Sequence, residues 1–415
     1  MDKLLAECFK AERWEHAVQH AFEKGIHTNE VLPFVEPSKR AWLYKTIASD
    51  QYRFSPPHEA QIPKDDGTMR TVYVNEPLDR ILLSIINDIF MEKCADMIHP
   101  RSKAYQKNLG TGKVVKEASA WLQKATADVV GVKADLSKYF DSVPIEFIDR
   151  AWDEAEKRMG KSIIIDMLRE FYHMDWLYDL DKQLVQKYTS LRQGAAISAW
   201  LANVVLYDMD KRISELDVFY VRYSDDILIL GDKWHEGYAI MQEELAKRNM
   251  KLNPKKVELL QKGVYFKFLG YELRNGDITL SRRRVKDFQK EIENRTIKKH
   301  YSYQSALNNV VDYLYKGNGE YSWATSVLGV VNIPEDIQIL NAFVMDCLRA
   351  TMTGKTKLGG LGFDVNRGIV RGTGRNVKAN RENTPTELDG YYTLICMQNN
   401  LLTSRDLYLM LVSEM

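Results

Sequence analysis

The chain has 415 residues, 58 Lys and Arg against 57 Asp and Glu, and four cysteines. This length allows two or three packed units, and the balanced charge gives no global sign of a polyanionic partner. The scattered cysteines argue against a zinc site or a disulfide framework, and no apolar run is long enough for a membrane span or a signal peptide, so we expect a cytoplasmic protein without a membrane segment.

In the first third of the chain, residues 1–50 have apolar side chains at three- and four-residue steps, which predicts helices. IPKDDGTMRTVYV (62–74) predicts a hairpin whose Asp-Asp-Gly turn is flanked by Lys64 and Arg70. Apolar spacing in 77–98 then predicts a helix buried along one face. The stretch that follows is a basic, glycine-containing loop by composition, RSKAYQKNLGTGKVV (101–115).

The middle of the chain alternates strands with helices. An apolar β-run, Val129 to Ala134, stops at Asp135. The later elements are predicted in this order: helical spacing over 145–180, a glycine-containing loop leading into one long apolar helix over 191–213, a β-hairpin over 219–230, a helix over 236–250 and a second hairpin over 264–280.

The last third of the chain is predicted to be mostly helical. Residues 281–300 have a helical pattern with eight Lys or Arg and three acids, and helical spacing continues to about Ala350. The segment 353–382 contains seven glycines and seven Lys or Arg, which predicts a loop or a short basic ribbon, and 402–414 predicts a terminal helix.

Two adjacent acids, Asp225 and Asp226, interrupt the apolar stretch YVRYSDDILIL. A hairpin with a Ser-Asp-Asp turn would present both carboxylates at its tip, and Asp135 ends a run that predicts a neighbouring strand. Converging carboxylates repel one another unless divalent cations neutralise them, and oxygen ligands favour Mg²⁺, two of which about 4 Å apart support phosphoryl transfer. Taken alone, an Asp-Asp pair between strands is more often a solvated turn.

Several stretches together resemble the reverse transcriptases of bacterial retroelements. The matching motifs occur in the order of that family over 62–273: IPKDDGTMR, KADLSKYFDSVP, RQGAAIS, the Tyr-Ser-Asp-Asp box, LNPKKVEL and FKFLGYEL. The resemblance implies an α+β right-hand polymerase with fingers, a palm containing an antiparallel sheet, and a helical thumb. It also implies RNA-directed DNA polymerase activity with two Mg²⁺ ions, or Mn²⁺ as a substitute, held by Asp135, Asp225 and Asp226.

The resemblance assigns further roles to single residues. It places Lys64, Arg70, Phe140, Gln193, Gly194 and Tyr223 at the incoming deoxynucleotide or template, with the Phe140 ring excluding a 2′-hydroxyl. Lys256 becomes the candidate acid that protonates pyrophosphate, although its neighbour Lys255 also fits. The residues expected at the template–primer duplex are Ser224, Phe268, Leu269, Gly270, Arg282, Arg283 and Arg284.

For each of these residues a plainer interpretation exists. Phe140 has the pattern of a core aromatic, Gly194 that of a helix start, and the basic residues of 281–300 that of a solvated helix face. The expected domains are a helical N-terminal region (1–50), fingers (51–130), palm (131–280), helical thumb (281–350) and a basic glycine-rich segment with a helical extension (351–415).

Among subfamilies, the chain lacks a Cys/His cluster after residue 300 and is not strongly basic. It therefore resembles defence-associated and abortive-infection reverse transcriptases, which implies copying of a non-coding RNA encoded nearby into cDNA and protection against phage. The alternative is a group II intron-like maturase and reverse transcriptase acting in splicing and retrotransposition. An RNA-dependent RNA polymerase and a nucleotidyl cyclase are further alternatives, but the chain has no Gly-Gly-Asp/Glu-Glu-Phe turn of a cyclase.

Overall fold

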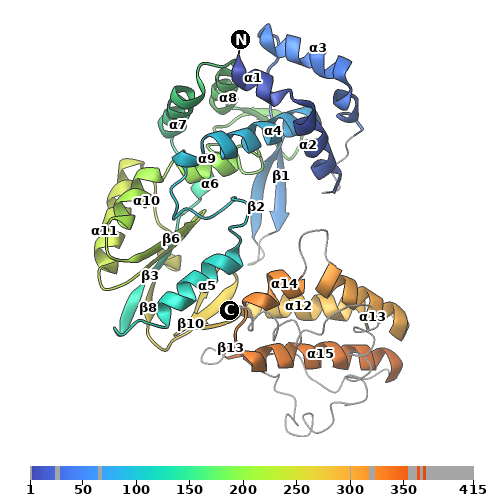
Figure 1. Cartoon of the computed structure of the whole chain (residues 1–415), viewed down its shortest axis with the longest axis vertical. Helices are drawn as coiled ribbons and strands as arrows, with labels where there is room; N and C mark the ends of the chain where they lie inside the picture. The colour runs from blue at the N-terminus through green and yellow to red at the C-terminus, as the bar shows by residue number, and fades with distance from the viewer. Residues whose placement is uncertain are drawn as a thin grey trace. The chain divides into compact units, whose positions relative to one another are not determined.

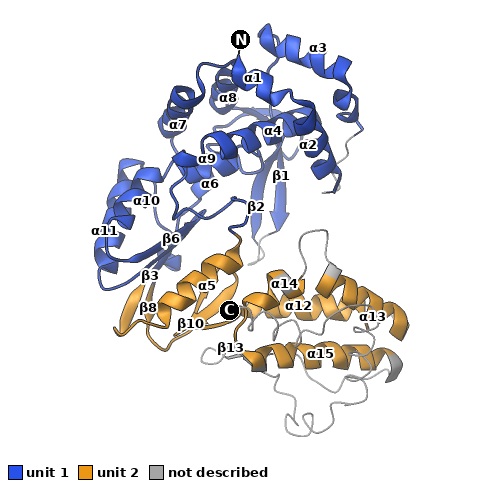
Figure 2. Cartoon of the chain, viewed as in Figure 1, with its two compact units in different colours: residues 1–109, 132–258 blue, residues 110–131, 259–415 orange. Residues whose placement is uncertain are grey.

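The structure is a computed structural model that describes residues 2–23, 29–63, 68–299, 301–316, 323–353, 362–364 and 368–370. The chain divides into two compact units (Figure 2). Unit 1 contains residues 1–109 and 132–258, and unit 2 contains residues 110–131 and 259–415. No helix in these described ranges is long and hydrophobic enough to span a lipid bilayer.

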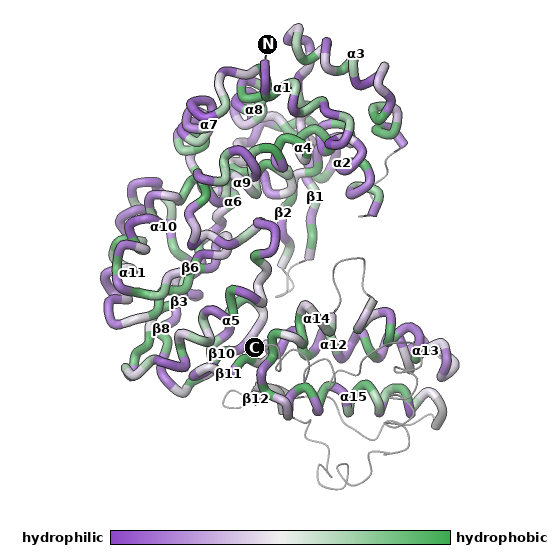
Figure 3. The backbone as a smooth tube through the Cα atoms, in the orientation of Figure 1, coloured by the Kyte–Doolittle hydropathy of each residue, from purple (hydrophilic) through white to green (hydrophobic). Residues whose placement is uncertain are grey.

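Helix α4 (Pro77–Lys93) is the hydrophobic centre of the N-terminal part of unit 1 (Figures 1 and 3). Proline suits the first helical turn because its fixed φ is helical and its missing N–H is not needed there. The buried residues of α4 include Ile81, Leu82, Ile85, Ile86, Ile89 and Phe90. They pack against α1 (Lys3–Cys8), α2 (Ala11–Glu23) and α9 (Ser198–Val204), while η1 (Leu32–Val35) leads into α3 (Pro37–Ala48). The helices predicted in 1–50 and 77–98 are confirmed.

The basic hairpin is also confirmed. Strands β1 (His58–Pro63) and β2 (Met69–Val74) pair antiparallel from His58–Val74 to Pro63–Met69. Their sheet has the order β2-β1-β4-β5, in which β4 (Trp176–Tyr178) is parallel to β1 and antiparallel to β5 (Leu184–Gln186). The turn between β1 and β2, including Lys64, lies outside the described residues.

A second sheet of four strands has the order β6-β7-β3-β8. The predicted hairpin consists of β6 (Phe219–Tyr223) and β7 (Asp226–Leu230), and the β-run forms β3 (Val129–Asp135). Because Tyr223 pairs with Asp226, the turn is Ser224-Asp225 rather than the predicted Ser-Asp-Asp, and Asp226 opens β7. The division between the units falls within β3 and after the first residue of β8 (Glu258–Gln261).

The single long helix predicted over 191–213 is wrong. The chain forms α9 and then α10 (Tyr207–Ser214), with Leu206 in a non-helical conformation between them. The carbonyls of Ala202 and Asn203 accept hydrogen bonds from Arg222, so a distant side chain satisfies groups at the end of α9. The other helices of unit 1 are η2 (Ala95–Met97), α6 (Tyr139–Ser142), α7 (Ile145–Met159), α8 (Ile163–His173), α11 (Trp234–Lys247) and η3 (Pro254–Lys256).

Unit 2 contains a meander of order β11-β10-β9 and a group of helices. The predicted second hairpin is confirmed: β10 (Tyr271–Arg274) and β11 (Asp277–Leu280) join through Asn275-Gly276, both at positive φ, as a tight two-residue hairpin turn requires. Strand β9 is Phe266–Phe268. The helical elements are α5 (Thr111–Leu122), α12 (Arg282–Arg295), α13 (Tyr303–Val311), the π-helical η4 (Asp312–Lys316), α14 (Trp323–Ser326), η5 (Leu328–Val330) and α15 (Pro334–Thr353).

Two segments predicted to be rich in loops contain regular secondary structure. The loop predicted for 101–115 ends early, because α5 begins at Thr111 and buries Val114, Val115 and Ala118 on one face. Within 353–382 the described residues form a short antiparallel ribbon of β12 (Gly362–Asp364) and β13 (Gly368–Val370). The helix predicted at 402–414 lies outside the described residues.

Candidate active site

Backbone hydrogen bonds place the end of β3 beside the hairpin tip. The N–H of Leu136, directly after Asp135, donates to the carbonyl of Asp225 over 3.1 Å. The N–H of Asn253 donates to the carbonyl of Asp135 over 2.9 Å, which brings the segment that carries Lys256 to the same point. Asp135 and the adjacent acids Asp225 and Asp226, which are distant in the sequence, therefore lie near one another at one end of the β6-β7-β3 strands.

The carboxylates of Asp135, Asp225 and Asp226 repel one another when they are ionised. Burial and then the negative charges of Asp225 and Asp135 raise the pKa of Asp226 to about 6. Burial and the charge of Asp135 likewise raise the pKa of Asp225, while the cations Lys256 and Arg70 act in the other direction. The hairpin therefore holds two half-buried acids where their ionised forms are unfavourable without additional positive charge.

Lys256 supplies part of that charge. Its Nζ lies 2.6 Å from Oδ2 of Asp135, whose side chain is buried. Burial alone would lower the pKa of Lys256, but the hydrogen bond to Asp135 and the charges of the three acids raise it. Of the two neighbouring lysines that the sequence leaves as candidates, Lys256 is the one with this ion pair.

The carboxylates of Asp135, Asp225 and Asp226 are suited to bind divalent cations. The donors are oxygen atoms only, which suits hard ions such as Mg²⁺ or Mn²⁺, and the raised pKa values of Asp225 and Asp226 show the repulsion that a cation would relieve. The ligands are not preassembled: within the described ranges, no three His, Cys, Asp or Glu side chains form a ready metal-binding group. The Lys256 ammonium stands in for cationic charge at Asp135.

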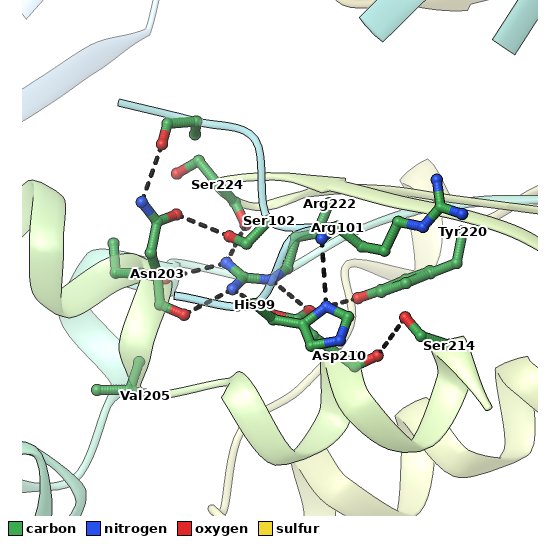
Figure 4. Close-up of polar contacts among 12 residues, drawn as sticks. His99, Arg101, Ser102, Asn203, Val205, Asp210, Ser214, Tyr220, Arg222 and Ser224 are labelled. Atoms are coloured by element: carbon green, nitrogen blue, oxygen red, sulfur yellow. Dashed lines mark hydrogen bonds and ion pairs between the residues drawn. The ribbon is translucent and has the colours of Figure 1, made fainter. Parts of the chain in front are cut away.

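A buried ion pair between Arg222 and Asp210 lies next to the tip of the β6-β7 hairpin (Figure 4). Arg222, in β6, is fully buried and donates from Nε and Nη2 to the two carboxylate oxygens of Asp210 in α10, over 2.8 and 2.6 Å. The same guanidinium donates to the carbonyls of Ala202, Asn203 and Ser224. The contact with Ser224 ties the interior of unit 1 to the turn that precedes Asp225.

Sequence reasoning missed this pair. An arginine inside an otherwise apolar strand was the available signal, because a buried guanidinium requires a partner. The sequence does not identify Asp210 as that partner. Tyr220 adds a further contact, since its hydroxyl donates to Oδ1 of Asp210 over 2.6 Å. In addition, the β6 backbone at Arg222 exchanges hydrogen bonds with the 101–103 segment.

Tyr105 is another residue that the sequence did not single out. Its hydroxyl lies 2.9 Å from the hydroxyl of Ser224, and its ring meets that of Phe140 edge to face at a centroid distance of 6.5 Å. Ser224 has a positive φ of 61° and only 5% exposure, so its hydroxyl faces Tyr105 rather than open solvent. Phe140, in α6, is half-buried beside these residues, and Tyr223 is half-buried at the end of β6.

The loop with Gln193 and Gly194 is tied to the basic hairpin. The carbonyl of Gln193 accepts a hydrogen bond from the N–H of Tyr73 over 2.7 Å. Gly194 has a φ of 119°, and a Cβ there would lie 2.6 Å from the Tyr73 carbonyl oxygen, so glycine is required. The plainer interpretation of Gly194 as a helix start is wrong, because α9 begins at Ser198. The preceding residue, Arg192, is buried and holds this loop in place, with its guanidinium 4.4 Å from the centre of the Phe171 ring.

Arg70 is exposed on β2, and its positive charge opposes part of the rise that burial and Asp135 cause in the pKa of Asp225. This places a cation within electrostatic reach of the acids. The other predicted cation of the hairpin, Lys64, lies outside the described residues.

The residues predicted to contact the duplex belong to unit 2, except Ser224. Phe268 is 1% exposed, so its side chain packs in the interior of unit 2 rather than on its surface. Leu269 and Gly270 form a half-buried turn with positive φ. In α12, Arg282 is exposed, Arg283 pairs with Asp287 over 3.1 Å, and the Arg284 guanidinium lies 4.2 Å above the Tyr271 ring and beside Gly270.

The curated proteins that resemble the chain are two proteins of Saccharomyces cerevisiae (strain ATCC 204508 / S288c) named for introns of COX1/OXI3. The intron 2 protein is 23% identical over 169 residues, 41% of this chain and 19% of that protein. The intron 1 protein is 22% identical over 214 residues, 50% of this chain and 23% of that protein. The matches thus span about a fifth of the length of these relatives.

Among solved structures, the chain is similar to apo telomerase from Candida tropicalis, with a TM-score of 0.44 and 12% identity over 72% of this chain and 57% of that one. A telomerase from Candida albicans in complex with a telomeric RNA fragment gives a TM-score of 0.40 and 10% identity over 77% and 63% of the two chains. Likenesses this weak support no functional inference.

The family comparison covers the stretch that contains the acids, Lys256 and the loop at Gln193. The model for the reverse transcriptase (RNA-dependent DNA polymerase) family matches residues 62–273, just over half of the chain and the same span as the predicted motifs. This match confirms the predicted fold class, a right-hand polymerase of mixed helices and antiparallel sheets, and the predicted enzyme class. The chain belongs to the reverse transcriptase family.

Proposed function

We propose that the chain copies RNA into DNA by nucleotidyl transfer at Asp135, Asp225 and Asp226. The observation that carries this proposal is the meeting of the three acids: a backbone hydrogen bond joins Leu136 to Asp225, and burial together with neighbouring carboxylates raises the pKa of both hairpin acids. Such a site is suited to bind divalent cations, which in turn can bind a substrate with negative charge.

Asp135, Asp225 and Asp226 would hold two Mg²⁺ ions, or Mn²⁺ in their place. When bound, such ions activate a primer 3′-hydroxyl and neutralise charge on the transferred phosphate. The task of this chain is to hold the carboxylates together, and the contact from buried Arg222 to the Ser224 carbonyl does so at the turn. Lys256 is placed to give a proton to the departing pyrophosphate once it leaves Asp135.

The deoxynucleotide would lie between the acids and the basic hairpin. Arg70, with Lys64, supplies positive charge for its triphosphate. Phe140 stands beside Tyr105, where its ring would exclude a ribose 2′-hydroxyl. Gln193 and Gly194 present backbone to the nucleotide or template, and Tyr223 flanks the acids.

The proposed domain assignment keeps the boundaries expected from sequence: 1–50 N-terminal region, 51–130 fingers, 131–280 palm, 281–350 thumb and 351–415 extension. The thumb would bind the RNA template and the cDNA. Exposed Arg282 is the member of the arginine group best suited to a phosphate, because Arg283 and Arg284 already pack against Asp287 and Tyr271.

A second candidate function is that of a group II intron-like maturase and reverse transcriptase. The two curated relatives are named for introns, and that observation favours an intron-type RNA as the natural template. The defence role with a dedicated non-coding RNA, predicted first from sequence, has no counterpart among the relatives found.

The deciding experiment is to purify the chain from its host and sequence all bound RNA and DNA, beside an Asp225→Ala/Asp226→Ala variant. Intron-derived RNA on both forms, with complementary DNA on the wild type alone, supports both the polymerase and the intron-type template. One discrete non-intron RNA with cDNA would favour the defence role. Bound RNA with no DNA on either form would contradict the polymerase proposal.

A further inference from the structure

Tyr105 follows a segment that is attached to the interior of unit 1. The N–H of Lys103 donates to the carbonyl of Arg222 in β6 over 2.8 Å. The side-chain NH₂ of Asn203, in α9, donates to the carbonyl of Ala104 over 2.9 Å. The backbone that leads into Tyr105 is therefore held in place, although Tyr105 itself is 46% exposed.

Tyr105 and Ser224 share an uncommon backbone conformation. Their φ angles are 62° and 61°, in the left-handed region that glycine adopts most readily. The side chains of the two residues also meet, because their hydroxyl oxygens lie 2.9 Å apart. A tyrosine at a position whose backbone would suit glycine indicates that the side chain has a function there.

The hydroxyl contact fixes the orientation of the Tyr105 ring. Ser224 is 5% exposed, and its carbonyl accepts a hydrogen bond from buried Arg222 over 3.3 Å, so it is a firm point of attachment. Burial raises the pKa of the Tyr105 phenol, and the charge of Asp225 adds to the rise. The hydroxyl therefore stays protonated and can donate a hydrogen bond.

The Tyr105 ring contacts the ring of Phe140. The two rings meet edge to face, with a centroid distance of 6.5 Å and an angle of 88° between their planes, which is a favourable arrangement for aromatic rings. Phe140 is half-buried and belongs to α6, a helix of only four residues. Tyr105 thus gives Phe140 a contact from a distant part of the chain.

We propose that Tyr105 is a positioning residue for sugar selection, which holds the Phe140 ring where it excludes a ribose 2′-hydroxyl. The hydrogen bond with Ser224 orients the Tyr105 ring, and that ring limits the movement of Phe140. The inference rests on the proposed function, since it deepens the role given there to Phe140. Tyr105 acts through Phe140 and not by its own contact with the sugar.

The test measures, with the full chain on a primer–template, the ratio of kcat/KM for a deoxynucleotide to kcat/KM for the matching ribonucleotide. We expect Tyr105→Leu to lower this ratio about fivefold, because the aromatic contact with Phe140 is lost. Tyr105→Phe keeps the ring and removes the hydroxyl, and should lower the ratio about twofold. Tyr207→Leu is the matched control and should leave the ratio unchanged, because the Tyr207 ring meets His99 edge to face instead, at 5.6 Å.

A double variant shows whether Tyr105 acts through Phe140. Tyr105→Leu combined with Phe140→Ala should lower the ratio no further than Phe140→Ala alone, because no ring is left to position. An additive loss overturns the proposal, since Tyr105 would then select the sugar independently. Equal losses of kcat/KM for both nucleotides leave the ratio unchanged and also overturn it, because a purely structural role has that effect.

If Tyr105→Leu fails to fold, the milder variants Tyr105→Phe and Ser224→Ala decide the question. Each should lower the ratio, and the two together should lower it no more than the larger single effect, because both remove the same hydrogen bond. An unchanged ratio in Tyr105→Phe, or an additive loss in the double variant, overturns the proposal.

A binding measurement separates this inference from the proposed function. A primer that ends in a dideoxynucleotide cannot be extended, so the affinity of the next nucleotide can be measured without the reaction. We expect the wild type to bind the deoxynucleotide more tightly than the ribonucleotide, and Tyr105→Leu to reduce that preference. The same result in a chain that extends no primer contradicts the polymerase and leaves this inference intact. A wild type that has no preference, or binds neither nucleotide, overturns the inference even if it extends primers.

Discussion

The guanidinium of Arg222 lies 2.6 Å from the carboxylate of Asp210, and neither side chain has any exposure to solvent. This pair links α10 to the strand that precedes the Ser224-Asp225 turn, and Arg222 also donates a hydrogen bond to the Ser224 carbonyl. Because the tip of the hairpin is thereby attached to the buried interior, we expect the positions of Asp225 and Asp226 to depend on these two residues.

We predict that Asp210→Asn destabilises the chain by about 3 kcal/mol, because it leaves a buried guanidinium without its counter-charge. A urea midpoint measures the change. Asp208→Asn, in the same helix but 76% exposed, is the control and should stay within about 0.5 kcal/mol of the wild type. Equal midpoints for the two variants would contradict the proposed importance of the buried pair.

Lys256 and Lys255 can be separated by their effects on rate. Since Lys256 alone of the two forms the ion pair with Asp135, Lys256→Met should slow single-nucleotide incorporation about 100-fold, whereas Lys255→Met should change it less than about threefold. Single-turnover kinetics at saturating deoxynucleotide make the comparison. A larger loss for Lys255→Met would reverse the assignment.

We predict that Asp226 makes the free energy of unfolding depend on pH when divalent ions are absent. Its folded-state pKa of about 6 lies above the ordinary aspartate value of 3.8, so the wild type loses stability as the pH rises from about 4 to 6, and the full loss is present above pH 6. Asp226→Asn should therefore be more stable than the wild type in EDTA at pH 8, by on the order of 2 kcal/mol, with the gain vanishing near pH 4.

Adding Mg²⁺ provides the control for this prediction. Bound cations offset the repulsion among the acids, so Mg²⁺ should raise the melting temperature of the wild type at pH 8 more than that of Asp226→Asn. A stability gain that persists unchanged at pH 4 would show that the cost at Asp226 is not electrostatic.

We predict that Phe140 helps the chain to select deoxynucleotides over ribonucleotides. Phe140→Ala removes the ring beside Tyr105 and should improve incorporation of a ribonucleotide relative to the matching deoxynucleotide by about tenfold or more. Phe147→Ala is the control, because the Phe147 ring, on α7, packs against Arg150 and Arg248 instead. Unchanged selectivity in Phe140→Ala would identify Phe140 as a plain core aromatic and contradict its role as a steric gate.

Local patterns in the sequence predicted β3, the hairpins and most helices, because these depend on neighbouring residues, but they did not predict β4, β5 or β8. The hairpin at 219–230 follows from the apolar runs on either side of Ser224-Asp225, and the tight turn at Asn275-Gly276 follows from residues that tolerate positive φ. The acids were found because their motif has a fixed order along the chain.

The missed features depend on contacts between distant residues. The break between α9 and α10 follows from Arg222 binding the Ala202 and Asn203 carbonyls, and no pattern within 191–213 records that contact. The approach of Tyr105 to Ser224 spans 119 residues, and Phe268 was assigned to nucleic acid although its neighbours bury it. Such contacts are visible only in three dimensions.

The most direct test of the central claim is primer extension on a defined RNA template with deoxynucleotides and Mg²⁺, comparing the wild type with Asp225→Ala/Asp226→Ala. The account predicts template-directed DNA synthesis by the wild type, loss of synthesis in the variant, and equal binding of the primer–template by both. Synthesis that survives in the variant, or a wild type that binds the RNA without extending the primer, would contradict it.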